Sequence, residues 1–259
     1  MKLQTEGIKK QIGGISLLED IALDLRSGEI YGIIGPNGVG KSTLLGIMAG
    51  TIKPDEGTVH LDGQSIARME RKQLARRMAV LQQGGIPPVG FTVHEVVAMG
   101  RYPHQSWLGG EGDDPEPIIE DALHAMGLEK LKRRRMHQLS GGERQRVALA
   151  KLMVQKPKVL LLDEPTTYLD IGYQSGLMDT VKEWQRKEGL LVVAVLHDLN
   201  LASLYCDKLA ALHGGTIAAY GTPAEVLTEE LIRFMYGTGA TIVPHPSCGV
   251  PQMMLQPGK

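Results

Sequence analysis

The 259 residues are enough for one large α/β domain or for a core with a subdomain, and a composition of 42% hydrophobic and 22% charged residues is ordinary for a soluble globular protein. The formal net charge of −1 argues against a general nucleic-acid-binding protein, which is usually clearly basic. The sequence has no run of about 18 apolar residues and no apolar signal segment at its start, so no membrane-spanning helix or secretion signal is expected. The two cysteines, Cys206 and Cys248, lack metal-site spacing and are expected to be reduced thiols in a cytoplasmic protein.

The chain begins with predicted strands. Residues 3–25 alternate apolar and polar positions in places, which indicates antiparallel strands at the edge of the fold. Ser27 and Gly28 form a predicted turn, and the apolar run at residues 30–34 predicts a buried strand.

A phosphate-loop motif follows that strand: Gly, four residues, Gly, Lys and then Ser or Thr. The glycines let the backbone curl so that successive N–H groups form an anion nest, and a predicted helix over residues 43–49 adds its positive end. Lys41 is expected to reach the β- and γ-phosphates, and the Ser42 hydroxyl is expected to bind Mg²⁺. The residues predicted to bind the phosphates are Gly35, Pro36, Asn37, Gly38, Gly40, Lys41, Ser42 and Thr43.

In the middle of the chain, the predicted strands give way to a region of predicted helices. A short strand at residues 58–61 with a turn at Asp62 and Gly63, a helix at 71–77 and a buried strand at 78–81 are predicted first. From residue 84 to residue 156 no strand is indicated, and helices are expected at 91–100 and 116–131, on either side of a polar breaker at 109–115. This region therefore predicts a helical subdomain inserted into a sheet-based core.

The core resumes at residue 157. Residues 159–162 are apolar on both faces and predict a central parallel strand, and residues 190–196 predict another buried strand, with helices at 171–188 and 199–205. Short strands at 209–212 and 216–219 and one or two short helices within 222–235 follow, and the Pro- and Gly-rich tail from Val243 gives no prediction.

Polar side chains follow three of the predicted buried strands, and ligands of open α/β sheets collect at the carboxyl ends of strands. Asp163 is predicted to hold Mg²⁺ directly or through water, and Glu164 to polarise an attacking water, the alternative being a solvated strand end. His197 is predicted to contact the γ-phosphate, although a lone histidine is more often structural. Gln83 is predicted to touch Mg²⁺ or the water, the alternative being a loop glutamine.

Residues 139–147, Leu-Ser-Gly-Gly-Glu-Arg-Gln-Arg-Val, closely resemble the signature of ATP-binding-cassette (ABC) ATPases. Ser140, Gly141 and Gly142 precede a predicted helix over 143–153 and offer N–H groups and a hydroxyl to an anion. The resemblance covers essentially the whole chain. It matches residues 35–43 to the Walker A motif, Gln83 to the Q-loop, 139–143 to the signature, 159–164 to the Walker B motif, 168–170 to the D-loop and His197 to the switch histidine.

This resemblance implies an α/β fold, a P-loop NTPase core with a mixed or parallel sheet, an N-terminal antiparallel β subdomain and an inserted α-helical subdomain. Four parts are expected along the chain. Residues 1–83 form the first part of the core, with the β subdomain and Walker A, and residues 84–156 form the helical subdomain with the signature. Residues 157–242 form the second part of the core, and residues 243–259 form the tail. ATP and Mg²⁺ are the implied cofactors, with Glu164 as the catalytic base and His197 as the γ-phosphate sensor. The family also implies a head-to-tail dimer of two copies, in which each ATP is held by Lys41 and its loop in one chain and by Ser140 and Gly142 of the other. The D-loop Asp170 is also expected among the nucleotide-binding residues.

One position departs from the family pattern. Ile12 stands where the family usually has an aromatic residue that stacks on adenine, and stacking is worth roughly 1–3 kcal/mol per base in nucleic-acid systems. Apolar packing by Ile12 is expected to hold adenine less specifically than a stacked ring, so we expect ATP and GTP hydrolysis within about tenfold of each other, a gap of about 1.4 kcal/mol. A competition assay measures this ratio, and a preference of roughly a hundredfold contradicts the expectation.

Residues 91–104 and the tail around 244–251 resemble the importer branch that serves iron-siderophore, haem and vitamin B12 permeases. This branch implies separate membrane permease subunits, an external substrate-binding protein that acts indirectly, no nucleic-acid partner and a peripheral position at the cytoplasmic face of the membrane. A groove near residues 83–101 is expected to receive a helix of the membrane partner.

Two other functions are alternatives to this one. A soluble cassette ATPase acting in DNA repair or on ribosomes usually has long coiled-coil insertions or two cassettes in one chain, and neither is present in this sequence. A regulatory nucleotide-binding module without turnover is disfavoured by the presence of both Glu164 and His197.

Overall fold

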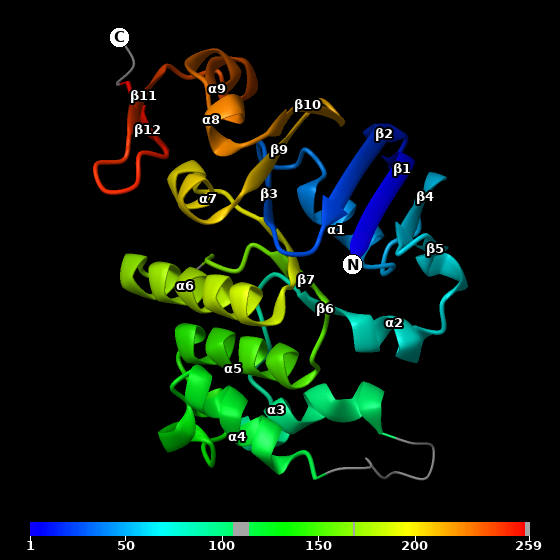
Figure 1. Cartoon of the computed structure of the whole chain (residues 1–259), viewed down its shortest axis with the longest axis vertical. Coiled ribbons are helices and arrows are strands. Elements are labelled where there is room, and N and C mark those ends of the chain that lie inside the picture. The colour runs from blue at the N-terminus through cyan, green and yellow to red at the C-terminus, as the bar shows by residue number, and fades with distance from the viewer. Residues whose placement is uncertain (106–113, 168, 257–259) are drawn as a thin grey trace. The chain divides into compact units, whose positions relative to one another are not determined.

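The computed structural model describes residues 1–105, 114–167 and 169–256 (Figure 1). Most of the polar breaker at residues 109–115 and the D-loop residue 168 lie outside this part of the chain. The chain forms two compact units, Met1–Arg68 with Leu191–Lys259 (unit 1) and Met69–Leu190 (unit 2). Among the described helices, none combines the length and the apolarity needed to cross a bilayer.

The first sheet of unit 1 is antiparallel, with the strand order β2-β1-β4-β5, as the alternation in residues 3–25 predicts. Its strands are β1 (Lys2–Ile12), β2 (Ile15–Arg26), β4 (Glu56–Leu61) and β5 (Gln64–Ser65). Gly13 and Gly14 join β1 to β2 with φ of 58° and 81°, and the positive φ at both positions is what a tight two-residue hairpin requires. Leu3, Ile8 and Ile21 are buried on the inner face of the sheet.

The second sheet of unit 1 has the order β10-β9-β3-β8. Strand β3 (Ile30–Ile34) runs parallel to both β8 (Leu191–Val195) and β9 (Lys208–His213), and β10 (Thr216–Gly221) pairs with β9 in the antiparallel sense. Every residue of β3 and β8 is buried, which confirms the buried strands expected from the apolar runs. The helices of unit 1 are α1 (Lys41–Met48), α7 (Leu199–Tyr205), α8 (Pro223–Val226) and α9 (Glu229–Tyr236), with the 3₁₀ turn η1 (Ile66–Arg68).

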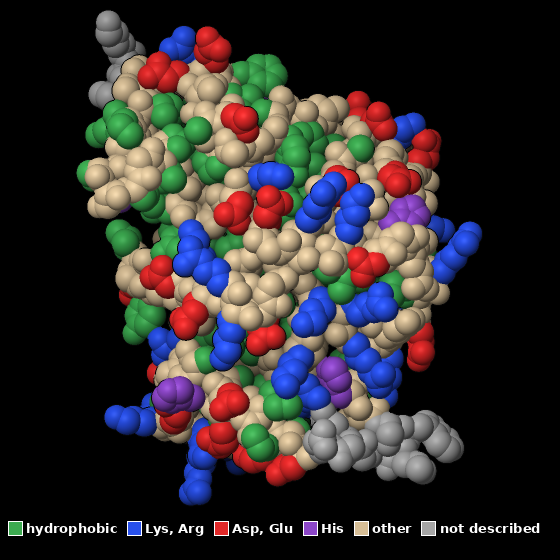
Figure 2. All heavy atoms as spheres, viewed as in Figure 1, with side chains coloured by type: hydrophobic (Ala, Val, Ile, Leu, Met, Phe, Trp, Pro, Cys, Tyr) green, Lys and Arg blue, Asp and Glu red, His purple; other side chains and the backbone are tan. Residues whose placement is uncertain are grey.

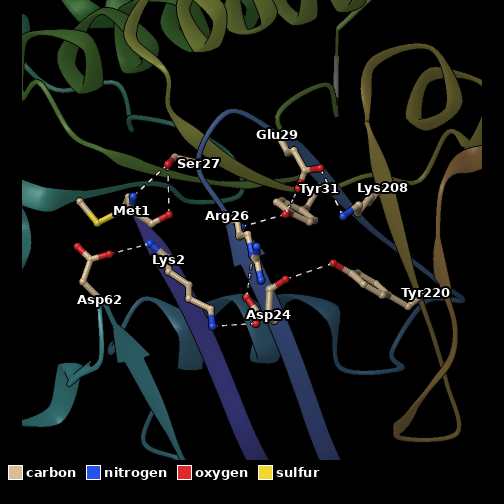
Figure 3. Close-up of polar contacts among 10 residues, drawn as sticks. All are labelled: Met1, Lys2, Asp24, Arg26, Ser27, Glu29, Tyr31, Asp62, Lys208 and Tyr220. Atoms are coloured by element: carbon tan, nitrogen blue, oxygen red, sulfur yellow. Dashed lines mark hydrogen bonds and ion pairs between the residues drawn. The ribbon is translucent and has the colours of Figure 1, made fainter.

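A polar network connects the two sheets of unit 1 (Figure 3). The Tyr31 hydroxyl in β3 accepts a hydrogen bond from the Arg26 N–H at the end of β2 (2.9 Å) and donates one to Glu29, and burial raises the pKa of this phenol well above its usual range. Lys208 in β9 lies 3.4 Å from Glu29, and the Tyr220 hydroxyl in β10 donates to the Asp24 carbonyl oxygen at 3.4 Å. Tyr31 therefore serves the packing of the sheets.

The tail, for which the sequence gives no prediction, forms an antiparallel hairpin of β11 (Ala240–Pro244) and β12 (Pro251–Leu255). The His245 N–H donates to the Val250 carbonyl oxygen at 2.8 Å and closes the loop between the two strands. Figure 2 shows hydrophobic side chains at the surface over this hairpin and α9, where Phe234, Met254 and Leu255 are exposed.

In the described part of unit 2, β6 (Met78–Leu81) and β7 (Val159–Asp163) pair as parallel strands. Its helices are α2 (Arg71–Arg77), α3 (Val93–Ala98), α4 (Glu116–Ala125), α5 (Gly141–Val154) and α6 (Ile171–Glu188), with the 3₁₀ turns η2 (Met99–His104), η3 (Glu129–Leu131) and η4 (Met136–Gln138). The described residues between 83 and 156 contain no strand beyond an isolated bridge between Thr92 and Arg135, so the helical character expected of this region is confirmed.

The helix expected over residues 116–131 is shorter than predicted. Helix α4 ends at Ala125, because Gly127 has a φ of 61° and turns the chain out of the helix. Residues 129–131 form the separate turn η3.

Candidate active site

The phosphate loop lies in unit 1 between β3 and α1. Gly35, Gly38 and Gly40 have φ of 153°, 77° and 106°, values that L-residues with side chains rarely adopt. A Cβ on Gly35 would stand 2.3 Å from the carbonyl oxygen of Leu212 in β9, so only glycine fits there. Helix α1 begins at Lys41 without a side-chain cap, the arrangement in which a helix N-terminus binds an anion.

Lys41 is held at this loop. Its ammonium donates to the carbonyl oxygens of Gly35 and Pro36, both at 2.8 Å, and the residue is only 5% exposed. The ammonium thus stays inside the curl of the loop, whereas the next residue, Ser42, is exposed. Both placements suit the predicted contacts with a phosphate and with Mg²⁺.

Tyr236 is a residue near the loop that the sequence analysis missed. It ends α9, and its hydroxyl forms a hydrogen bond with the Gly35 backbone. Burial raises the pKa of this phenol to about 12, and the hydrogen bond opposes the rise. No sequence signal marks this tyrosine, because it follows no motif and meets the loop only through tertiary packing.

His197 leaves the same sheet edge as the phosphate loop, because β8 and β3 are neighbouring parallel strands. The Leu196 N–H donates to the Ile33 carbonyl oxygen at 3.2 Å, which fixes the chain just before the histidine. Asp198 then caps α7 and accepts the N–H groups of Asn200 (2.8 Å) and Leu201 (3.0 Å). The exposed His197 therefore lies between two anchored segments.

Unit 2 brings together two other predicted residues at the ends of β6 and β7. Gln83 Nε2 donates to Glu164 Oε2 at 2.7 Å, and Thr167 Oγ1 donates to the same oxygen at 3.2 Å. Glu164 has a φ of 50°, an uncommon conformation for a side chain of this size and one that recurs at functional sites. Asp163, the last residue of β7, is half-buried. Unit 2 thus orients the carboxylate of Glu164 through two donors.

The signature residues form the start of α5, which begins at Gly141 instead of the predicted residue 143. The Ser140 hydroxyl accepts the Glu143 N–H at 3.3 Å, and Glu143 Oε2 accepts the Ser140 N–H at 2.7 Å, so the two residues form a capping box. Glu143 therefore belongs to the first turn of α5, which explains the earlier start of the helix.

Further contacts tie the signature helix to the neighbouring loops of unit 2. A Cβ on Gly142 would lie 3.5 Å from the Leu169 side chain of the D-loop. Gln145, a buried residue that the sequence analysis missed, donates to the Pro165 carbonyl oxygen at 2.9 Å. Asp170 caps α6 by accepting the Tyr173 N–H at 3.0 Å.

The capping box makes the stability of the protein depend on pH. The hydrogen bond from the Ser140 N–H lowers the pKa of Glu143 from its usual value of 4.5. Because the pKa is lowered by folding, this contribution is present above the pKa of the unfolded chain and disappears as the pH falls through the folded value. Urea unfolding should therefore show that Glu143→Gln loses less stability than the wild type between about pH 5 and pH 3. Glu183→Gln, an exposed glutamate of α6, should keep the wild-type pH dependence, and equal pH dependence in all three proteins would contradict this prediction.

Ile12, the residue predicted to lie against the adenine ring of the nucleotide, stands at the tip of the β1–β2 hairpin in unit 1. It is 54% exposed, and its cross-strand partner Ile15 is 72% exposed. The two side chains therefore form an exposed aliphatic pair, of which the sequence analysis recognised only the first member. Two large exposed apolar residues at one position are suited to packing against a ligand.

Comparisons with known proteins identify the family of the chain. The sequence profile of the ABC transporter family matches residues 18–167. The chain is 41% identical to the uncharacterized ABC transporter ATP-binding protein YvrA of Bacillus subtilis over 99% of its own length, although it spans only 58% of that protein. It is 41% identical to the petrobactin import ATP-binding protein FpuD of Bacillus anthracis over 96% of this chain and 91% of the relative. For the ferric enterobactin transport ATP-binding protein FepC of Escherichia coli the identity is 40%, over 96% and 92%.

Solved structures give the same result. The protein is similar to cbiO1 of Clostridium perfringens, part of the ABC transporter complex cbiONQ, with a TM-score of 0.76 and 30% identity over 91% of this chain and 95% of that one. It is also similar to the dimeric ABC transporter cassette MJ0796, with a TM-score of 0.75 and 27% identity over 85% and 98%. The chain therefore belongs to the ABC transporter family, as an ATP-binding subunit with the ATPase activity of that family.

Proposed function

We propose that this protein hydrolyses ATP to power the import of an iron-siderophore, haem or cobalamin through a separate membrane permease. The observation that carries the proposal is the similarity of about 40% over nearly the whole chain to ATP-binding proteins named for petrobactin import, ferric enterobactin transport and hemin import. The importer-like residues 91–104 support the same branch.

The nucleotide site proposed here uses the residues expected from the sequence. The glycine-rich curl, the uncapped start of α1 and the enclosed ammonium of Lys41 suit a triphosphate. The Ser42 hydroxyl, the Asp163 carboxylate and the Gln83 amide offer the oxygen ligands that Mg²⁺ prefers, and bound Mg²⁺ would neutralise charge on the phosphates.

For the chemistry, Glu164 takes a proton from the attacking water as the water oxygen bonds to the γ-phosphorus and ADP leaves. The two donors on one carboxylate oxygen, from Gln83 and Thr167, hold Glu164 for this step. His197 contacts the γ-phosphate. In a head-to-tail dimer of two copies, Ser140, Gly141 and Gly142 of the other copy complete the site, with Asp170 close to the contact.

The permease is proposed to dock on unit 2. Phe91, Met99 and Tyr102 are exposed apolar side chains within and just before α3 and η2, and Tyr102 is 71% exposed. Exposed apolar side chains that gather in one short segment mark interaction surfaces, and an amphipathic helix of a partner binds such surfaces. Docking there would hold the protein at the cytoplasmic face of the membrane.

An aromatic ring at residue 12, the predicted adenine-binding position, should strengthen nucleotide binding. Ile12→Tyr is expected to lower the Kd for ATP by about tenfold, because a stacked ring adds roughly 1–3 kcal/mol per base. Equilibrium binding of a fluorescent ATP analogue, with unlabelled ATP as competitor, measures the change. Met254→Tyr, which adds the same ring at an exposed position of β12, is the matched control, and a Kd that is unchanged in Ile12→Tyr or equally lowered in the control would contradict the assignment.

The import function is tested by co-purifying the permease and measuring uptake into vesicles of ferric siderophores, haem and cobalamin, with the Glu164→Gln variant as the inactive control. ATP-dependent uptake of one of these compounds is expected. Hydrolysis that is stimulated by ribosomes or DNA and not by any permease would overturn the proposal.

A further inference from the structure

The C-terminal hairpin of β11 and β12 forms hydrogen bonds with α7, the helix that follows His197, and all the residues involved belong to unit 1. The Met253 N–H of β12 donates to Asn200 Oδ1 at 2.6 Å, and Asn200 Nδ2 donates to the Met253 carbonyl oxygen at 3.1 Å. The amide of Asn200 thus pairs with both backbone groups of a single residue, as a neighbouring strand would. Gln252 Nε2 reaches the Asn200 carbonyl oxygen at 3.5 Å and adds a third, weaker contact.

Asn200 is well placed to influence His197. It lies in the first turn of α7, and its own N–H is one of the two groups that the Asp198 cap accepts. On the N-terminal side of His197, the chain is fixed by the hydrogen bond from the Leu196 N–H to the Ile33 carbonyl oxygen. The position of His197 is therefore set by the β3–β8 edge on one side and by the first turn of α7 on the other.

The hairpin is itself tied to α9, so it can hold α7 in place. The Ile242 N–H of β11 donates to Glu229 Oε1 of α9 at 3.3 Å, and the Gln256 N–H donates to the Gly239 carbonyl oxygen at 3.0 Å and so extends the pairing of the two strands of the hairpin. Helix α9 also carries Tyr236, which meets Gly35 of the phosphate loop. The element that supports the hairpin is therefore the one that contacts the other half of the unit 1 site.

We propose that Asn200 is a positioning residue for His197: by clamping the first turn of α7 to β12, it keeps the histidine where it meets the γ-phosphate. This inference rests on the proposed role of His197. It gives the C-terminal hairpin a part in turnover, because the hairpin becomes the fixed support of the switch histidine.

The test compares ATP turnover with ADP binding in the full-length protein. In Asn200→Ala, kcat at saturating ATP should fall about five- to tenfold, the loss expected from one or two hydrogen bonds, whereas the Kd for ADP should stay within about twofold. ADP lacks the phosphate that His197 contacts, so its binding reports on the phosphate loop alone. Asn200→Asp should give an intermediate kcat, because it keeps the acceptor for the Met253 N–H and places a second acceptor against the Met253 carbonyl.

Gln256→Ala is the matched control. It removes another side-chain hydrogen bond of the same hairpin, from Gln256 Nε2 to Thr241 Oγ1 at 3.0 Å, without touching α7. The control should keep the wild-type kcat. Thermal melting of every variant shows whether it is folded, and a loss of ADP affinity as large as the loss of kcat would show that Asn200 acts only through general stability, which overturns the proposal.

Variants at His197 separate this inference from the proposed function beneath it. If His197→Ala hydrolyses ATP at the wild-type rate, the role assigned to His197 is wrong. If His197→Ala is impaired and Asn200→Ala is not, the positioning inference alone is wrong. If both single variants are impaired, the double variant His197→Ala with Asn200→Ala should be no slower than His197→Ala alone, because Asn200 acts through the histidine.

Discussion

Glu164→Gln is expected to lower ATP turnover by about a thousandfold while leaving ATP binding intact. The amide has the shape of the carboxylate but cannot take the proton of the attacking water. Gln83 and Thr167 both donate to one oxygen of Glu164, and the glutamine variant retains an acceptor oxygen for them. The substitution should therefore remove the base without rearranging the residues around it.

Phosphate release at saturating ATP measures the loss, and equilibrium binding of ATP shows that the site is still occupied. Glu183→Gln makes the same change of charge at an exposed position of α6 and should leave turnover unchanged. If Glu164→Gln turned over ATP within about threefold of the wild type, the proton would have to leave through another group, and the assignment of the base would be wrong.

The predictions for individual elements succeeded where local chemistry defines the ends of an element. Helix α6 occupies the predicted residues, with Asp170 as its cap and Gly189 at a φ of 63° where it ends. Helix α7 likewise begins after the Asp198 cap. The apolar runs that precede the phosphate loop and His197 became buried parallel strands, because a strand with apolar side chains on both faces is stable only in a sheet whose two faces are both covered.

What could not be predicted depends on contacts between distant parts of the chain. The strands of the C-terminal hairpin have no clear alternation, and their partners, Asn200 and Glu229, lie on other elements. The same holds within the candidate site. The apolar strands predict that Gln83 and Glu164 leave the sheet at the same edge. They do not predict that Gln83 donates a hydrogen bond to Glu164, or that Gln145 donates one to the Pro165 carbonyl oxygen, because these contacts depend on tertiary packing.

Ser140→Arg is expected to reduce ATP turnover by about a hundredfold or more, which is the effect of losing one donor at a preorganised anion site. Ser140 and Gly141 are exposed at the start of α5. An arginine there loses the cap, places a positive charge at the positive end of the helix and fills the space that a nucleotide held by the other copy would need. Ser140→Asn keeps a side chain that caps the helix and can donate an N–H to the nucleotide, so it should retain most of the activity.

The decisive measurement is turnover as a function of protein concentration. If each site is built from two copies, turnover per wild-type chain should rise with concentration as the dimer forms. Mixing Ser140→Arg with Lys41→Ala should then restore part of the activity, because a mixed dimer contains one site with both lesions and one with neither. A rate per chain that is independent of concentration and undiminished in Ser140→Arg would mean that one chain completes the site alone, and the head-to-tail arrangement would have to be abandoned.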